Sequence, residues 1–123
     1  ILSLRATAES MGLKYAHFIQ PIPDLDKTLS EDELKRARWI TGERYLRSIV
    51  HPAEALKKQG VPVVSLTSVF RDIKETIYGD EVHCAYDERG DNRGYRIMSR
   101  FIATSLGDLW KLKPLAKTAE SPE

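Results

Sequence analysis

The sequence has 123 residues, of which 41% are hydrophobic and 30% are charged. This length suits one compact domain of about 100 to 150 residues. The formal net charge of +1 provides no long-range field that would attract nucleic acid. A single cysteine, Cys84, excludes a disulfide within the chain, and no apolar run reaches the roughly 18 to 20 residues of a membrane span. We therefore expect a globular chain that binds neither nucleic acid nor a membrane.

The two ends of the sequence suggest a part of a longer domain. The chain begins with Ile1, and residues 2–10 already have the pattern of an amphipathic helix that Gly12 would close in a left-handed conformation. Residues 111–123 contain two prolines and no apolar periodicity, so we expect a disordered tail. Residues 1–110 are therefore interpreted as the C-terminal portion of a single domain.

Two segments have the pattern of short strands. Residues 13–19 alternate between two faces and end before Pro21, which cannot donate to a central ladder. Residues 61–66 form a continuous apolar run, which favours a parallel strand buried on both faces. A sheet of two parallel strands is not stable by itself. We therefore expect the N-terminal part of the sheet to be missing, with its strands encoded upstream.

Helices are predicted between and after these strands. Ser30 and Glu33 match a capping box, which predicts the start of a long helical segment that is interrupted near Gly42, bends at Pro52 and ends at Gly60. Its imperfect apolar stripe consists of Leu34, Ala37, Ile40, Leu46, Ile49 and Val50.

The last third of the chain has two further helical patterns, separated by a polar loop over 77–92. Thr67 or Ser68 could cap a short helix that carries Val69, Phe70 and Ile73. The last helix is expected at about 93–109, with one apolar face formed by Ile97, Met98, Phe101, Ile102, Ser105 and Leu109. Alternating helices and strands predict an α/β fold with a parallel sheet covered by helices.

The polar loop contains the strongest candidate for chemistry, Asp80 and His83. In open α/β sheets, ligands bind at loops beyond the carboxyl ends of the strands. An aspartate three residues before a histidine can place its carboxylate against the imidazole, which fixes the tautomer and stabilises the imidazolium. A simpler interpretation is that Asp80 caps a turn and His83 is its surface neighbour.

The flanks of this pair extend the pattern. Asp80-Glu81-Val82-His83, the loop residues 90–92 and the helix over 95–103 together resemble the last sequence block of SGNH (GDSL-type) hydrolases. Residues 60–70 are also similar to the strand and short helix that lead into this block, and residues 15–21 to a strand ending of some bacterial members. The resemblance implies a partial three-layer α/β/α, flavodoxin-like fold. It also implies an esterase with a Ser-His-Asp triad, in which His83 is the general base and Asp80 orients it.

The same resemblance implies a small-molecule or carbohydrate ester as substrate and no cofactor. The family's Gly-Asp-Ser block and its oxyanion-donor blocks are absent, and none of the nine serines lies in a Gly-Asp-Ser or Gly-x-Ser-x-Gly setting. We therefore expect the nucleophile to lie in the missing N-terminal half of the same domain, and the isolated chain to be inactive. The alternative is a non-catalytic interaction module that retains the last elements of the fold.

Other candidate sites have weaker patterns. His83, Cys84, Asp80 and Asp87 lie close in sequence but lack the paired spacings of a zinc site. Cys84 is expected to be a buried thiol, and His17 a core or rim residue of a strand. The basic residues near Trp39 alternate with acidic ones, which is typical of a solvated helix face with ion pairs.

Overall fold

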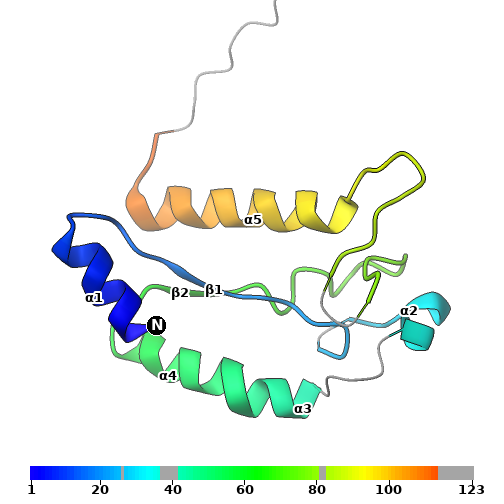
Figure 1. Cartoon of the computed structure of the whole chain (residues 1–123), viewed down its shortest axis with the longest axis horizontal. Coiled ribbons are helices and arrows are strands. Elements are labelled where there is room, and N and C mark those ends of the chain that lie inside the picture. The colour runs from blue at the N-terminus through cyan, green and yellow to red at the C-terminus, as the bar shows by residue number, and fades with distance from the viewer. Residues whose placement is uncertain (26, 37–41, 81–82, 114–123) are drawn as a thin grey trace, which may run out of the picture.

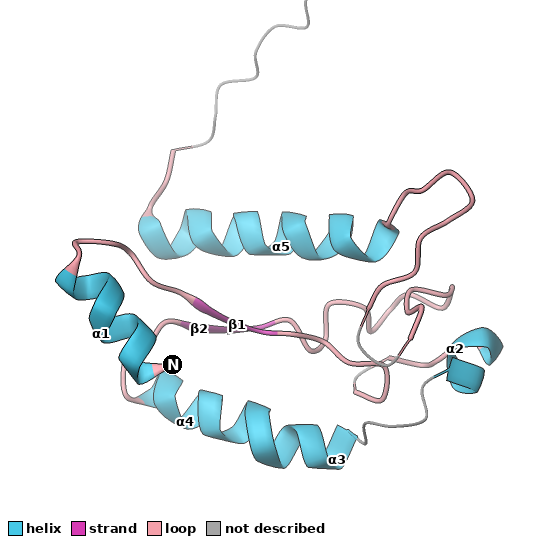
Figure 2. Cartoon of the chain, in the orientation of Figure 1, coloured by secondary structure: helices cyan, strands magenta, loops and turns pink. Residues whose placement is uncertain are grey.

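Two parallel strands lie between layers of helices (Figure 1). The computed structural model describes residues 1–25, 27–36, 42–80 and 83–113. The elements in chain order are α1 (Leu2–Ser10), β1 (His17–Ile19), α2 (Glu31–Arg36), α3 (Gly42–Tyr45), the π-helical turn η1 (Leu46–Val50), α4 (His51–Lys58), β2 (Val63–Ser65) and α5 (Arg93–Trp110). Helices α3 and α4 lie on one side of the strands and α5 on the other (Figure 2). This arrangement confirms the mixed α/β class.

The predicted parallel pairing of the two strands is confirmed. His17 lies opposite Val63 and Ile19 opposite Ser65. The amide of His17 donates to the carbonyl of Pro62 at 2.8 Å. Both strands are shorter than predicted, and residues 13–16 are not part of the ladder. The pairing does not extend to residues 13–16, because the segment before β2 turns away at Gly60. Gly60 has φ +85°.

The segment from α3 to α4 is continuous and widens before Pro52. Because proline has no amide hydrogen, the helical hydrogen-bond ladder is interrupted at this position. The π-helical turn η1 accommodates the break, and the amide of His51 donates to the carbonyl of Leu46. At the predicted break the helix restarts, since the π-helical turn η1 ends at Val50 and α4 begins at His51.

The predicted apolar stripe of this segment is wrong in part. Val50 is buried, whereas Leu34 and Ile49 are 61% and 44% exposed. In α2 the side chain that faces the interior is Glu33 rather than Leu34, because Glu33 meets hydrogen-bond donors from other segments. Ala37 and Ile40 lie outside the described residues.

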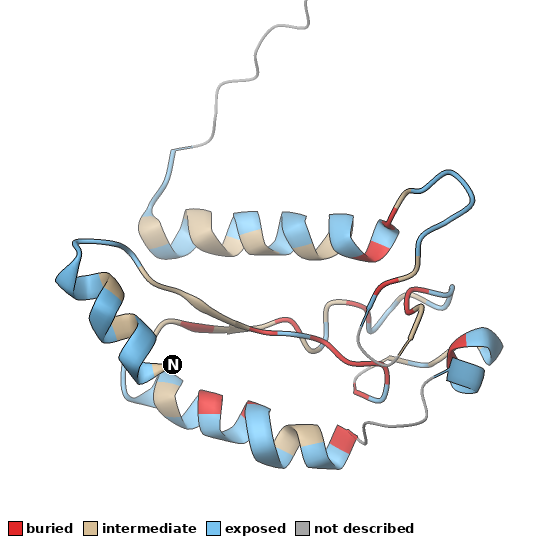
Figure 3. Ribbon diagram, in the orientation of Figure 1, coloured by how far each residue is buried: buried red, intermediate tan, exposed pale blue. Residues whose placement is uncertain are grey.

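Buried residues form two clusters, and many of them lie along the strands and in the loops after the strands (Figure 3). The first cluster packs the sheet against α4 and consists of Ile19, Ile22, Leu25, Val50, Ala53, Val61 and Val63. The second cluster consists of Phe70, Ile77, Tyr78 and Cys84, with Ile97 and Met98 of α5 packed against it. The second cluster therefore connects the polar loop to the last helix.

The short helix predicted after β2 is wrong. Residues 67–72 form successive turns, in which the amide of Val69 donates to the carbonyl of Leu66 and that of Arg71 to Ser68. The hydroxyl of Ser65 accepts from the amide of Thr67 at 3.3 Å. Such side-chain bonds to nearby amides compete with helix formation.

Helix α5 matches its predicted bounds to within one residue at its C-terminus. Lys111 closes it in the left-handed conformation (φ 54°), and the amide of Leu112 donates to the carbonyl of Gly107 at 3.0 Å. The first residues of the predicted tail therefore cap α5, and 114–123 lie outside the described residues. No helix in the described part of the chain has the length and apolar character needed to cross a membrane.

The first turn of α5 makes a close approach that requires glycine. A Cβ at Gly94 would overlap Sγ of Cys84 and lie 2.7 Å from its Cβ. We expect Gly94→Ala to lower the free energy of unfolding by about 1–3 kcal/mol through overpacking.

The matched control is Gly107→Ala, because a Cβ at Gly107 has no atom within 4 Å and alanine favours a helix interior. Chemical denaturation of the two variants provides the measurement. Equal stabilities of Gly94→Ala and Gly107→Ala would contradict the proposed overlap.

Candidate active site

Within the polar loop, residues 77–80 pair with residues 83–85 as the two arms of a small hairpin. Tyr78 and Cys84 form an antiparallel bridge. The amide of Gly79 donates to the carbonyl of His83 at 2.8 Å, and the amide of Ala85 donates to that of Ile77 at 2.7 Å. Tyr78 and Cys84 are 1% and 4% exposed, so the base of the hairpin is anchored in the second core cluster. The opposite end of the hairpin carries Asp80 and His83.

Asp80 and His83 make the contact that the spacing predicts. Nδ1 of His83 lies 2.8 Å from Oδ2 and 3.1 Å from Oδ1 of Asp80. A carboxylate only accepts hydrogen bonds, so we assign the ring proton to Nδ1, which leaves the lone pair of Nε2 available. Among the described residues, no hydrogen bond reaches Nε2 of His83. The imidazole is therefore oriented for accepting a proton at Nε2.

The same carboxylate also stabilises the turn. The amide of His83 donates to Oδ1 of Asp80 at 2.7 Å. The side chains of His83 and Asp80 are 65% and 47% exposed. The turn-capping interpretation and the orienting interpretation therefore describe two contacts of one aspartate, and the catalytic role of the pair stays a prediction.

A buried carboxylate, Glu33, accepts hydrogen bonds from the first arm of the hairpin. Its Oε1 accepts from the amides of Ile77 and Tyr78 at 2.8 and 3.0 Å. Its Oε2 accepts from Nζ of Lys27 at 2.7 Å and from the amide of Ser30 at 2.8 Å. Ile77 and Tyr78, which directly precede Gly79 and Asp80, are therefore held in place by one side chain from α2.

The charge on Glu33 is compensated where it lies. The side chains of Lys27 and Glu33 are 1% and 0% exposed. Burial opposes ionisation of Glu33, but the hydrogen bonds from Lys27, Ser30, Tyr78 and Ile77 outweigh it and hold the pKa of Glu33 below its ordinary value. Glu33 is therefore an ionised acceptor in the folded chain.

The second arm of the hairpin is fixed at its base by Asn92. Its Oδ1 accepts from the amide of Tyr95 at 2.9 Å and caps α5. Its Nδ2 donates to the carbonyl of Cys84 at 2.9 Å. Asn92 therefore joins the residue after His83 to the start of the last helix, and its buried amide is committed to this structural role.

The two buried groups of the hairpin base are poor proton donors. Burial, together with the charge of Glu33, raises the pKa of the Cys84 thiol to about 11. Burial also raises the pKa of the Tyr78 hydroxyl far above its usual range. Cys84 is a neutral buried thiol at physiological pH, as the sequence predicts, rather than a thiolate nucleophile.

The remaining candidates do not join the Asp80–His83 pair through any hydrogen bond described. His17 lies on β1 with Nδ1 3.5 Å from the hydroxyl of Tyr15, and burial and the chain N-terminus lower the pKa of His17. Within the described ranges, no group of three or more His, Cys, Asp or Glu side chains could hold a metal ion. On the basic helix face, Lys35 pairs with Asp32 at 3.7 Å.

Comparisons of the chain with protein-family models, with curated proteins and with solved structures found no match. The assignment of a function therefore depends on the residues of the hairpin and on their contacts.

The Glu33 network leads to a prediction for stability. Because the folded state holds the pKa of Glu33 below its ordinary value of 4.5, the unfolded state binds more protons in acid. This contribution to stability is present above pH 4.5 and is lost as the pH falls through the lower folded-state value. Glu33→Gln leaves Lys27 buried without a counter-charge, so we expect a loss of about 3 kcal/mol at neutral pH.

Denaturant titrations between pH 3 and 7 measure both effects. Glu43→Gln is the control, since Glu43 pairs with Arg47 on an exposed surface and such pairs contribute little. Equal losses of stability for the two variants would contradict the role of Glu33.

Proposed function

We propose that this chain is the C-terminal portion of an SGNH-type ester hydrolase in which Asp80 and His83 are two members of a Ser-His-Asp triad. The observation that carries the proposal is the contact of 2.8 Å between Nδ1 of His83 and Oδ2 of Asp80 on an exposed hairpin. The resemblance of residues 80–103 to the last block of that family supports the same function.

In this mechanism a serine from the upstream part of the domain attacks the acyl carbon of an ester. Nε2 of His83 takes the serine proton, and Asp80 stabilises the imidazolium that forms. The ester C–O bond then breaks, and the leaving alkoxide receives the proton from His83. Water releases the acyl group by the same proton path and regenerates the serine. The reaction needs no cofactor.

The finer fold that we propose is a three-layer α/β/α domain whose sheet continues beyond β1. Successive residues of a strand direct their amides to opposite edges, and His17 and Ile19 bond to β2, so the N–H and C=O of Phe18 face the other edge. A groove of about 390 Å³ lies along β1 and α4. Exposed apolar side chains on both helix layers, Ile49 and Phe101, support further strands between the layers.

The open edge also supports the second candidate, a non-catalytic module that binds a partner through β1. Both candidates need a polypeptide beside β1, but only the hydrolase needs the imidazole of His83. Substitution of His83 therefore separates the two candidates, whereas substitution of Phe18 tests the strand edge that both of them need.

The first test uses the complete protein, meaning the product of the whole reading frame that contains this sequence. We expect His83→Ala to lower kcat for p-nitrophenyl acetate about 10⁶-fold, and Asp80→Asn to lower it about 10⁴-fold through the wrong tautomer. His51→Ala, at an exposed histidine of α4, is the matched control and should leave kcat within about twofold. Turnover by His83→Ala at the rate of the control would exclude the hydrolase.

The second test examines the open edge of β1. We expect Phe18→Pro to weaken association of the chain with a separately expressed upstream segment at least about tenfold, because proline removes the outward amide. Phe18→Ala measures the loss of the ring alone. Sedimentation of the mixed segments provides the readout, and equal association of Phe18→Pro and Phe18→Ala would contradict strand pairing at this edge.

A further inference from the structure

The first turn of α2 contacts three successive residues at the start of the hairpin. The hydroxyl of Ser30 lies 2.8 Å from the hydroxyl of Thr76. Oε1 of Glu33 accepts from the amides of the next two residues, Ile77 and Tyr78, at 2.8 and 3.0 Å. One helix start therefore holds the chain at the point where it enters the first arm of the hairpin.

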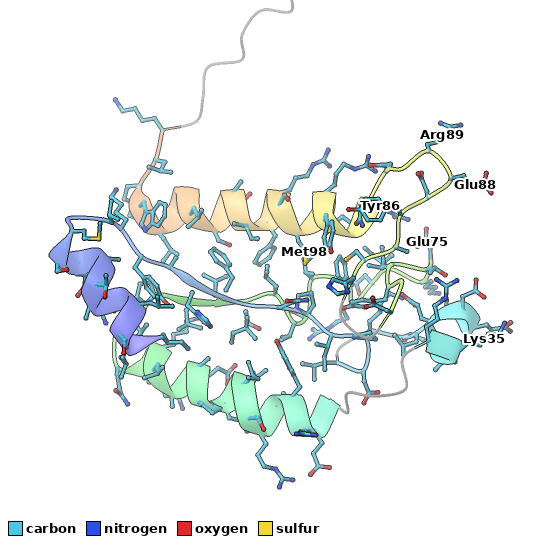
Figure 4. The ribbon with its side chains drawn as sticks, viewed as in Figure 1. Lys35, Glu75, Tyr86, Glu88, Arg89 and Met98 are labelled. Atoms are coloured by element: carbon cyan, nitrogen blue, oxygen red, sulfur yellow. The ribbon has the colours of Figure 1, made fainter. Side chains whose placement is uncertain are left out.

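Glu33 has no direct access to a substrate. Its side chain has no solvent exposure. Lys35, on the outer face of the same helix, is 72% exposed and extends away from the molecule in Figure 4. Because a fully buried carboxylate cannot touch a bound ester, an effect of Glu33 on catalysis has to act through the hairpin.

The two amides converge on one carboxylate oxygen, which requires a bend in the backbone. In an extended strand, successive amides point to opposite sides, whereas the amides of Ile77 and Tyr78 both reach Oε1 of Glu33. Successive amides in a turn form a concave site for an anion, and hydrogen bonds to an ionised acceptor are stronger than neutral ones. Glu33 therefore stabilises the direction in which the first arm leaves this bend.

The contact between Asp80 and His83 joins the two arms, and each arm has its own anchor. Asp80 follows the bend on the first arm, which Glu33 holds. His83 precedes Cys84 on the second arm, and the carbonyl of Cys84 accepts from Nδ2 of Asn92 at 2.9 Å. The side chains of His83 and Asp80 are 65% and 47% exposed, so core packing does not fix their contact. The position of the carboxylate against Nδ1 of His83 therefore depends on both anchors.

We propose that Glu33 is a positioning residue for the proposed hydrolysis: its carboxylate fixes the first arm of the hairpin and thereby holds Asp80 against His83. The catalytic consequence rests on the proposed function, whereas the effect of Glu33 on the contact between Asp80 and His83 does not. A misplacement of about 1 Å that originates far from the reacting atoms can lower turnover about 10²-fold.

The kinetic experiment compares two double variants of the complete protein. The amide variant, Lys27→Met with Glu33→Gln, keeps a carbonyl oxygen for the two backbone amides. The acceptor-free variant, Lys27→Met with Glu33→Met, has none. Both variants remove the two buried charges together, and replacing a buried ion pair by neutral residues of similar volume is often tolerated.

For p-nitrophenyl acetate, we expect the acceptor-free variant to lower kcat about 10²-fold and to leave KM within about twofold, since the lost interaction acts in the transition state. The amide variant should restore kcat to within about fivefold of the parent, because an oxygen again accepts from the two amides. Glu33→Asp keeps the charge but withdraws the carboxylate by one methylene group, so it should lower kcat about tenfold.

Val50→Ala is the control for a general loss of stability. Val50 is buried in the first core cluster, and its truncation removes packing without touching the hairpin. Its kcat should stay within about twofold of the parent at a temperature at which the variant is folded.

The tautomer of His83 provides a readout that does not require turnover. In alkaline buffer, nitrogen-15 NMR distinguishes a neutral imidazole with its proton on Nδ1 from one with its proton on Nε2, and His83→Ala identifies the signals. We expect the Nδ1–H tautomer in the parent, in Val50→Ala and in the amide variant. Its population should fall in the acceptor-free variant, because the carboxylate of Asp80 is then less firmly held against Nδ1.

Equal kcat values and equal tautomer populations in the two double variants would overturn the inference. An equal loss of kcat in Val50→Ala and in the acceptor-free variant would overturn it as well. If the acceptor-free variant does not fold, Glu33→Asp provides the same comparison, and parent-like kcat and tautomer in that variant would contradict a positioning role. A parent protein that does not hydrolyse the ester would contradict the proposed function alone, because the tautomer still tests Glu33.

Discussion

Glu33, a carboxylate with no solvent exposure, connects the start of α2 and the loop before it to the hairpin, which lies more than forty residues later in the sequence. It closes the capping box at the start of α2, pairs with Lys27 in the preceding loop and accepts from two amides of the hairpin. An unpaired carboxylate would be costly here, so the helix start, the loop and the hairpin are stable only together. The position of Asp80 therefore depends on a residue 47 positions earlier.

Local patterns predicted the parts of the fold that depend on near neighbours. The capping box of Ser30 and Glu33 is present, since the amide of each residue bonds to the side chain of the other. The contact of Asp80 with His83 also spans three residues. In contrast, the amides of Ile77 and Tyr78 reach Glu33 across more than forty residues, and no periodicity of one segment contains that information.

The same limit explains the errors of the sequence-based predictions. Leu34 was expected on the inner face of α2, but the polar contacts of Glu33 turn that face inward and leave Leu34 exposed. The segment after β2 has apolar residues at helical spacing, yet the hydroxyl of Ser65 bonds to the amide of Thr67. In both places hydrogen bonds, rather than hydrophobic spacing, decide the local structure.

The direction of the strands relates the candidate site to the open edge of the sheet. The segments that follow β1 and β2 lie on the same side of the molecule as the hairpin (Figure 1). A parallel strand added beside Phe18 would end on that side too, because parallel strands share the edge formed by their carboxyl ends. A nucleophile that follows such a strand would lie at the level of His83, whose Nε2 has no partner among the described residues. In the proposed hydrolase, the open edge and the oriented imidazole would therefore belong to the same site.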